Sequence, residues 1–138
     1  MKRDKLDDVF SKLMREAYNW TCCKCGTYFP EGYRQGIHAS HIYSRRHQLL
    51  RHYPLNVVAH CYGCHQWYGG HPVLGGKWAT DYLGQGVIEL LEDRLRERRK
   101  YTRADKSEMY EHYKAEHERL RRLRMSGETG VLEVIPFD

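Results

Sequence analysis

The sequence predicts a small α+β fold, in which a strand–strand–helix core lies between an N-terminal helix and several C-terminal helices. Three observations predict it. Two Cys-x-x-Cys pairs have 35 residues between them. Two short β-branched stretches lie in that interval, and apolar residues recur at helical spacing before and after it. A chain of 138 residues is long enough for one compact domain and little more.

We therefore expect a single domain over 1–138, made of an N-terminal helix in 1–20, the zinc-clamped core in 21–72, a helical extension in 73–126 and a tail in 127–138. Hydrophobic residues make up 41% of the chain and charged residues 30%, a composition typical of soluble globular proteins. No apolar run is long enough to span a bilayer, and the N-terminus lacks the apolar segment of a signal peptide. We expect a cytoplasmic protein without a membrane partner.

The first helix is expected over Lys5–Tyr18, because Leu6, Phe10, Leu13 and Ala17 recur every three or four residues. The core follows in this order: a loop or hairpin turn at Thr27–Gly36, a strand at Ile37–Ile42, a long turn-rich loop at Tyr43–Pro54, a strand at Leu55–His60, and a helix from about Cys64.

Beyond the core, Gly69-Gly70-His71-Pro72 is expected to end that helix, and Gly75-Gly76 to keep the chain mobile. One or two helical turns are expected over Trp78–Leu83. A helix is predicted over Val87–Lys100, with Val87, Leu90, Leu91 and Leu95 on its buried face. A capping-box sequence at Thr102–Asp105 predicts a last helix to about Arg124, with Met109, Tyr113, Leu120 and Leu123 as its buried stripe.

The cysteines predict a structural zinc site formed by Cys22, Cys25, Cys61 and Cys64. Two cysteines three positions apart can bind one ion at a tight turn, and two such pairs complete a tetrahedron. Cys23 could also be paired with Cys25, but the Cys22/Cys25 spacing matches that of the second pair. We treat Cys23 as a spare thiol.

From Gly32 to Thr80 the chain has no Asp or Glu, although it has four arginines, one lysine and seven of the nine histidines. A cationic, imidazole-rich surface suits a polyanion such as the DNA backbone. The alternative is a chance distribution in a His-rich segment.

Three segments together resemble the HNH (ββα-metal) endonucleases: Ala39-Ser40-His41-Ile42-Tyr43-Ser44-Arg45, Leu55-Asn56-Val57-Val58 and Cys61-Tyr62-Gly63-Cys64-His65. Within that family the chain is most similar to the phage NinG/Rap-type recombination nucleases. Endonuclease VII of phage T4, a Holliday-junction resolvase, has a similar zinc clamp. The resemblance covers roughly Cys22 to Tyr68, and it implies a ββα-metal core.

The resemblance implies a role for each site residue. His41 would be the general base that activates water, and Asn56 would orient His41 or its loop. His65 would hold a catalytic divalent ion, Mg²⁺ or Mn²⁺, and Arg45 would bind the scissile phosphate. From the cation-rich stretch we also expect Arg46 and Arg51 to bind substrate.

Each of these roles has a structural alternative. His41 could be a satisfied core histidine, Asn56 a turn cap after Pro54, His65 a helix-start residue and Arg45 a solvated loop charge. Ser40 stands where many HNH enzymes have a metal-ligating Asp. His38 could supply a ligand, although strand alternation puts it on the face opposite His41. His47, His52, His60 and His71 are expected to be structural or to lie near the substrate.

The expected function is a metal-dependent DNA endonuclease that cuts branched, recombination or replication intermediates of a phage in the bacterial host cytosol. The alternative is a zinc-dependent DNA-binding or packaging accessory protein with a vestigial nuclease site. A third reading is a structural zinc module for protein contacts. The arginine-rich C-terminal helices could contact DNA, carry internal ion pairs, or form a homodimer interface.

Overall fold

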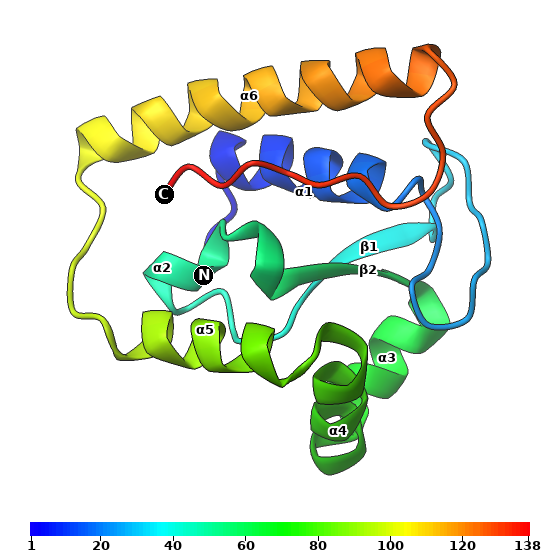
Figure 1. The fold of residues 1–138 in the computed structure, drawn as a ribbon, viewed down its shortest axis with the longest axis horizontal. Helices are drawn as coiled ribbons and strands as arrows, with labels where there is room; N and C mark the ends of the chain where they lie inside the picture. The colour runs from blue at the N-terminus through cyan, green and yellow to red at the C-terminus, as the bar shows by residue number, and fades with distance from the viewer.

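The computed structural model describes all 138 residues and shows a small α+β fold with six α-helices and one two-stranded antiparallel sheet (Figure 1). The elements in chain order are α1 (Lys5–Ala17), β1 (Ile37–His41), α2 (Gln48–Arg51), the 3₁₀ helix η1 (Pro54–Asn56), β2 (Val57–Cys61), α3 (Tyr62–Gly70), α4 (Pro72–Leu83), α5 (Gln85–Arg96) and α6 (Arg103–Met125).

Helices α1 and α6 run side by side, and α1 lies between α6 and the sheet (Figure 1). The Asp4 side chain caps α1 by accepting a hydrogen bond from the Asp7 N–H, and the Asp7 side chain accepts one from the Asp4 N–H. Thr102 and Asp105 form the same reciprocal cap on α6. The apolar face of α1 packs on Met109, Tyr113 and Leu120, so the predicted stripe of α6 is buried within the chain.

The sheet pairs Ile37 with Cys61 at one end and His41 with Val57 at the other. Because the strands are antiparallel, this register gives the sheet two chemically distinct ends. The second Cys-x-x-Cys pair begins at one end. His41 lies at the other, where the chain leaves β1 and enters the loop to β2. Val57, Val58 and Ala59 are all buried, which fits strands covered by helices.

Two predicted boundaries in this loop are wrong. The long loop of Tyr43–Pro54 contains a short helix, α2, whose Leu49 and Leu50 side chains are buried. The second strand begins at Val57 and not at Leu55, because Pro54 starts a 3₁₀ turn that continues to Asn56. Proline suits the first position of such a turn, since its fixed φ is helical and it has no N–H to satisfy.

Two predictions for the helical extension are also wrong. Gly75-Gly76 lies inside the twelve-residue helix α4, which starts at Pro72. A Cβ at Gly75 would lie 3.1 Å from Tyr68 atoms, so this glycine permits close packing of α4 on α3. Helix α5 ends at Arg96, before Lys100, and Leu90 is 40% exposed on it.

Three apolar clusters hold the fold together. The largest joins α1, α6 and Val57; a second surrounds Trp20 next to the cysteines; a third joins the β1–β2 loop to α5 through Leu50, Tyr53 and Leu91. Trp20 therefore packs in the cysteine cluster and not in the main core. None of the helices combines the length and apolar character that crossing a membrane requires.

Candidate metal centre and histidine-lined cavity

The four predicted zinc ligands converge. The sulfur atoms of Cys22, Cys25, Cys61 and Cys64 all lie within 4.8 Å of one another, and the Sγ atoms of Cys25 and Cys61 are 3.7 Å apart. In a tetrahedron with Zn–S bonds of about 2.3 Å the sulfur atoms are separated by about 3.8 Å. The cluster could therefore hold a structural metal such as zinc with little rearrangement.

The two turns that carry these cysteines are built alike. The Cys25 N–H points to the Cys22 Sγ at 3.5 Å, and the Cys64 N–H points to the Cys61 Sγ at the same distance. Such N–H contacts orient a sulfur and stabilise negative charge on it. Cys23 lies outside the cluster, and burial raises the pKa of its thiol to about 12. This supports its reading as a spare thiol.

A cavity of about 480 Å³ is bounded by α1, β1, the β1–β2 loop and the first turn of α3. Its lining brings together residues that are far apart in sequence, namely His38, His41, Arg45, Arg51, His52 and His65. The predicted base, metal-holding histidine and phosphate-binding arginine therefore face one space. Asn56 does not line it.

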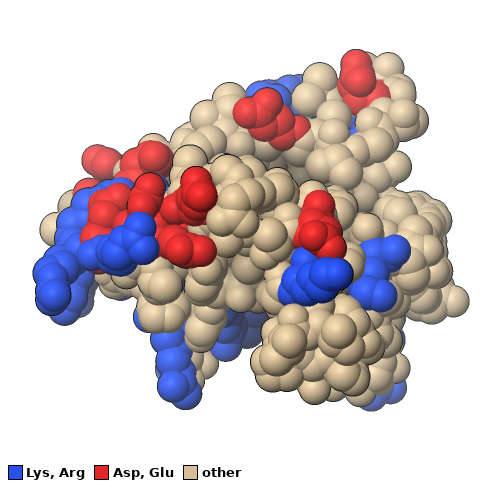
Figure 2. All heavy atoms as spheres, turned by 60° about the horizontal axis from the view of Figure 1, so that its bottom comes forward, with Lys and Arg blue, Asp and Glu red and all other residues tan.

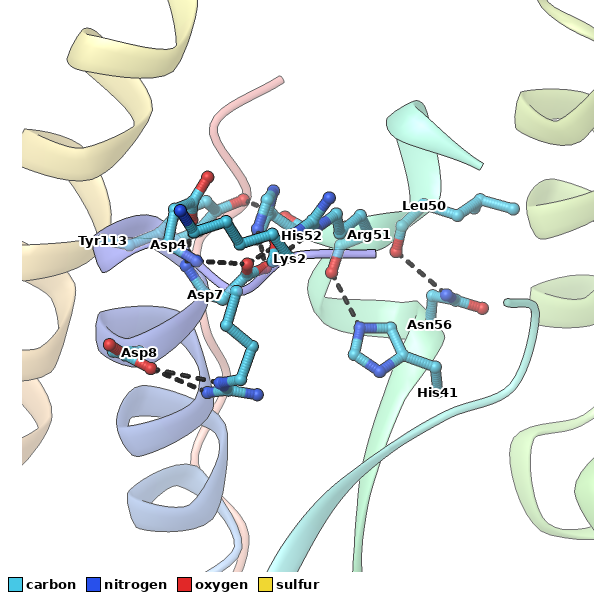
Figure 3. Close-up of polar contacts among 11 residues, drawn as sticks. Lys2, Asp4, Asp7, Asp8, His41, Leu50, Arg51, His52, Asn56 and Tyr113 are labelled. Atoms are coloured by element: carbon cyan, nitrogen blue, oxygen red, sulfur yellow. Dashed lines mark hydrogen bonds and ion pairs between the residues drawn. The ribbon is translucent and has the colours of Figure 1, made fainter. Parts of the chain in front are cut away.

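His41 is held in a single orientation. Its Nε2 lies 2.9 Å from the carbonyl oxygen of Arg51 (Figure 3). A carbonyl can only accept, so Nε2 carries the proton in the neutral ring, and Nδ1 is left to accept one. Burial lowers the pKa of His41 to about 4, although the Arg51 carbonyl opposes this shift by favouring the charged ring. His41 is therefore neutral near pH 7.

Asn56 is fully buried, and its side-chain amide ties the loop to the second strand. Its Nδ2 donates to the carbonyls of Tyr43 and Leu50, and its Oδ1 accepts from the Tyr43 N–H, all at 2.9 Å. Leu50 directly precedes Arg51, whose carbonyl receives His41 (Figure 3). Asn56 thus fixes the loop that orients His41 and does not touch the cavity itself.

His65 lies in the first turn of α3. Its Nδ1 is 3.3 Å from the hydroxyl of Ser40, which is itself buried. Its ring stacks on His38, with the planes 2° apart and the centroids at 5.2 Å. His38 therefore lines the cavity beside His65, although it lies on the opposite strand face from His41. Burial lowers the pKa of His65, which favours the neutral ring needed for metal binding.

The three loop arginines differ in role. Arg45 lines the cavity and has no acidic partner. Arg46 is exposed and lines a different groove, between the loop and α5. Arg51 pairs with Asp7 of α1 and also donates to the carbonyl of Lys2 (Figure 3). Its positive charge is therefore compensated, which weakens the prediction that Arg51 binds substrate.

Asp7 is the site residue that sequence reasoning missed. It is buried and accepts hydrogen bonds from Arg51, from the Asp4 N–H and from the His52 ring at 2.8 Å. Burial alone would raise the pKa of Asp7, but these donors outweigh it and hold the pKa well below its usual range. The Asp4-x-x-Asp7 capping pattern was visible in the sequence, although its long-range partners were not.

The other unassigned histidines differ from one another. His52 is buried against Phe10 and bonded to Asp7, which is a structural role. His60 is fully buried between the rings of Tyr68 and Trp78, and neither ring nitrogen has a hydrogen-bond partner. His71 caps α3 by bonding to the Trp67 carbonyl, and His47 is exposed.

The arginine-rich helices are largely ion-paired within the chain. Arg94 is buried and donates to the Leu49 carbonyl, which leaves it no role on the surface. The paired arginines and their acidic partners are Arg96 with Asp93, Arg99 with Glu97 and Asp138, Arg119 with Glu116, and Arg121 with Glu31. In Figure 2 basic side chains accordingly occur in separate groups, several of them next to acidic ones.

Comparisons of the chain with known protein families, with curated proteins and with solved structures found no match.

Proposed function

We propose that this chain is a metal-dependent DNA endonuclease of the HNH (ββα-metal) type, acting on branched, recombination or replication intermediates of a phage. The observation that carries the proposal is the shared cavity. A neutral imidazole with one free nitrogen, a second imidazole and an uncompensated arginine all line one space of about 480 Å³. The order of His41, Asn56 and His65 between and beside two cysteine pairs is that of the HNH family.

The proposed chemistry is hydrolysis of a phosphodiester bond. Arg45 binds the non-bridging oxygens of the scissile phosphate and stabilises the charge that develops on them. His41 Nδ1 accepts a proton from water as that water attacks phosphorus, while its Nε2–H stays bonded to the Arg51 carbonyl. The P–O bond to the leaving 3′ oxygen then breaks.

A divalent ion held by His65 would act as a Lewis acid at the phosphate and the leaving oxygen. The donor set there is sparse: the His65 imidazole, whose Nδ1 faces the Ser40 hydroxyl, and the His38 imidazole stacked on it. The only groups of three or more convergent candidate ligands are the four cysteines and Asp4, Asp7 and His52. Nitrogen ligation favours Mn²⁺ over Mg²⁺, and water and phosphate oxygens would complete the shell.

The four-cysteine cluster is proposed to hold a structural Zn²⁺. Four thiolates close the tetrahedron and leave no open position, so this ion would fold the chain and take no part in hydrolysis. It joins the turn after α1 to the end of β2 and the start of α3. The metal thus positions the helix that carries His65.

The test is a cleavage panel over linear, nicked, forked and four-way DNA with Mg²⁺ or Mn²⁺. The parent should cut at least one substrate, and His41→Ala should abolish cutting while zinc content and circular dichroism stay unchanged. Cutting by His41→Ala at the parental rate would contradict the assignment of the base. His71→Ala, an exposed histidine that lines neither this cavity nor the groove between the loop and α5, is the matched control and should cut normally.

The second candidate is a zinc-dependent DNA-binding or packaging accessory protein with a vestigial nuclease site. One observation favours it. No carboxylate lies beside His65, because Ser40 occupies the neighbouring position and Asp7 is engaged by Arg51 and His52. DNA retention by the parent without cleavage of any substrate in the panel would support this candidate.

A further inference from the structure

A second groove lies next to the β1–β2 loop. Its volume is about 520 Å³, and it is lined by residues 46–49 of the loop and by residues 94, 95 and 97–100 at the end of α5 and just after it. Arg45 and Arg46 are consecutive, yet the first lines the His41 cavity and the second lines this groove. The same loop therefore contributes neighbouring residues to both spaces.

The groove is strongly basic. Five cations line it: Arg46, Arg94, Arg98, Arg99 and Lys100. Its one acidic residue, Glu97, is paired with Arg99, and Asp138 contacts both Arg94 and Arg99. Arg46, Arg98 and Lys100 have no acidic partner and are exposed, so their charge is uncompensated.

The groove also has a rigid floor. Arg94 is buried and donates two hydrogen bonds to the Leu49 carbonyl, with its guanidinium 3.8 Å from the centre of the Tyr53 ring. The Tyr101 N–H donates to the side-chain oxygen of Gln48. These contacts hold the α5–α6 segment against the loop. The unpaired cations therefore extend from a backbone that is held in place, which lowers the entropy cost of binding a ligand.

We propose that this groove is a second binding site for the phosphodiester backbone of nucleic acid, outside the cavity where cleavage would occur. The inference rests on the proposed function, since it is the adjoining cavity that makes DNA the expected polyanion. Uncompensated cations in a groove bind phosphates without reading sequence, so the site contributes affinity and register. A backbone that crosses the loop would meet Arg45 on one side and Arg46 on the other.

The test compares two triple variants in a His41→Ala background, using the full zinc-loaded chain. The first removes the free groove cations: Arg46→Gln, Arg98→Gln and Lys100→Gln. The second, the matched control, removes three exposed cations of α6 that lie outside the groove: Lys106→Gln, Lys114→Gln and Arg122→Gln. Both lose the same net charge, and none of the six side chains makes a hydrogen bond or ion pair that folding would miss.

Binding of fluorescent linear duplex and four-way DNA would be measured by anisotropy over a series of salt concentrations. The groove triple should reduce the slope of log K against log [salt] by about 1 for each cation removed, and the control triple should leave the slope unchanged. Equal slopes for the two triples would overturn the proposal.

The outcome separates this proposal from the proposed function. If the parent cuts no DNA but only the groove triple lowers the salt slope, the nuclease assignment is wrong and the proposed DNA-binding groove is supported. If the parent cuts DNA and the two triple variants have the same slope, the nuclease assignment is supported and the DNA-binding groove is wrong. In a cutting parent, the groove triple should raise KM and leave kcat unchanged, because none of its residues lines the His41 cavity.

Discussion

Asp7 in the first turn of α1 pairs with Arg51 at the end of α2, although the two are 44 positions apart in the sequence. The same carboxylate accepts from His52, and the carbonyl of Arg51 accepts from His41 (Figure 3). A buried acid on the N-terminal helix therefore fixes the backbone that sets the orientation and tautomer of the proposed base. Helix α1 therefore supports the proposed site as well as covering the core.

Replacing Asp7 with Asn should destabilise the protein by about 1.5–3 kcal/mol, because charge-assisted hydrogen bonds to Arg51 and His52 are lost. Asp8→Asn is the matched control. Asp8 pairs with Arg3, but both side chains are more than half exposed, so its loss should cost less than about 1 kcal/mol. Urea unfolding at pH 7 measures both, and equal costs would contradict a structural role for the Asp7 pair.

The stabilisation by Asp7 should depend on pH in one direction. Its folded-state pKa lies below the ordinary value of 3.8, so folding favours the charged form. The stabilisation is therefore fully present above about pH 4 and is lost as the pH falls through the lower folded-state pKa. Unfolding free energies of the parent and of Asp7→Asn should converge in strong acid, whereas a constant difference down to pH 2 would contradict the shift.

Asn56→Ala should destabilise the protein by about 2 kcal/mol or more. The change would leave the N–H and the carbonyl of Tyr43 without their side-chain partner, and each such group costs about 1–3 kcal/mol. The Leu50 carbonyl would lose one hydrogen bond but would still accept from the Tyr53 N–H. Gln66→Ala, at an exposed position, should stay within about 0.5 kcal/mol. Hydrogen exchange should also show faster opening of residues 43–52 in Asn56→Ala. Unchanged exchange in this loop would mean that the amide does not hold it.

The sequence predicted those parts of the molecule that depend on local pattern. The apolar periodicity of α1, the β-branched strands and the two cysteine pairs each follow from spacing within a few residues, and the structure has all of them. The boundary errors have local causes too. Pro72 was expected to end a helix and Pro54 to end a loop, although proline is also favoured at the first position of a helix.

The sequence could not show which charged residues form ion pairs with residues far away in the chain. The stretch from Gly32 to Thr80 has no carboxylate, which suggested that all its cations were free to bind a polyanion. In the structure Asp7 approaches from another element and compensates Arg51, while Arg45 and Arg46 stay unpaired. A charge pattern along one segment cannot reveal which of its members another segment neutralises. The division of the loop arginines between two grooves has the same origin.

Removal of metal from the cysteine cluster should unfold the region around α3. Cys25→Ser and Cys64→Ser should each lose bound zinc and shift the thermal transition strongly downward, because metal binding contributes folding free energy directly. Cys23→Ser should retain one zinc per chain, since Cys23 lies outside the cluster. Elemental analysis with thermal unfolding measures both quantities. Full zinc content in Cys64→Ser would contradict the proposed ligand set.

The rate of DNA cleavage should fall in acid with a midpoint near pH 4, not near 6.5. The pKa of His41 is lowered to about 4 by burial, so the ring stays neutral, and able to accept a proton from water, down to that pH. The expected profile is therefore level from about pH 5.5 to 7.5 and falls about tenfold per pH unit below 4. Circular dichroism and zinc content measured across the same range would separate a loss of rate from a loss of fold or metal. A rate that instead rises tenfold per unit between pH 6 and 8 would identify a metal-bound water as the titrating group, and His41 would then not be the base.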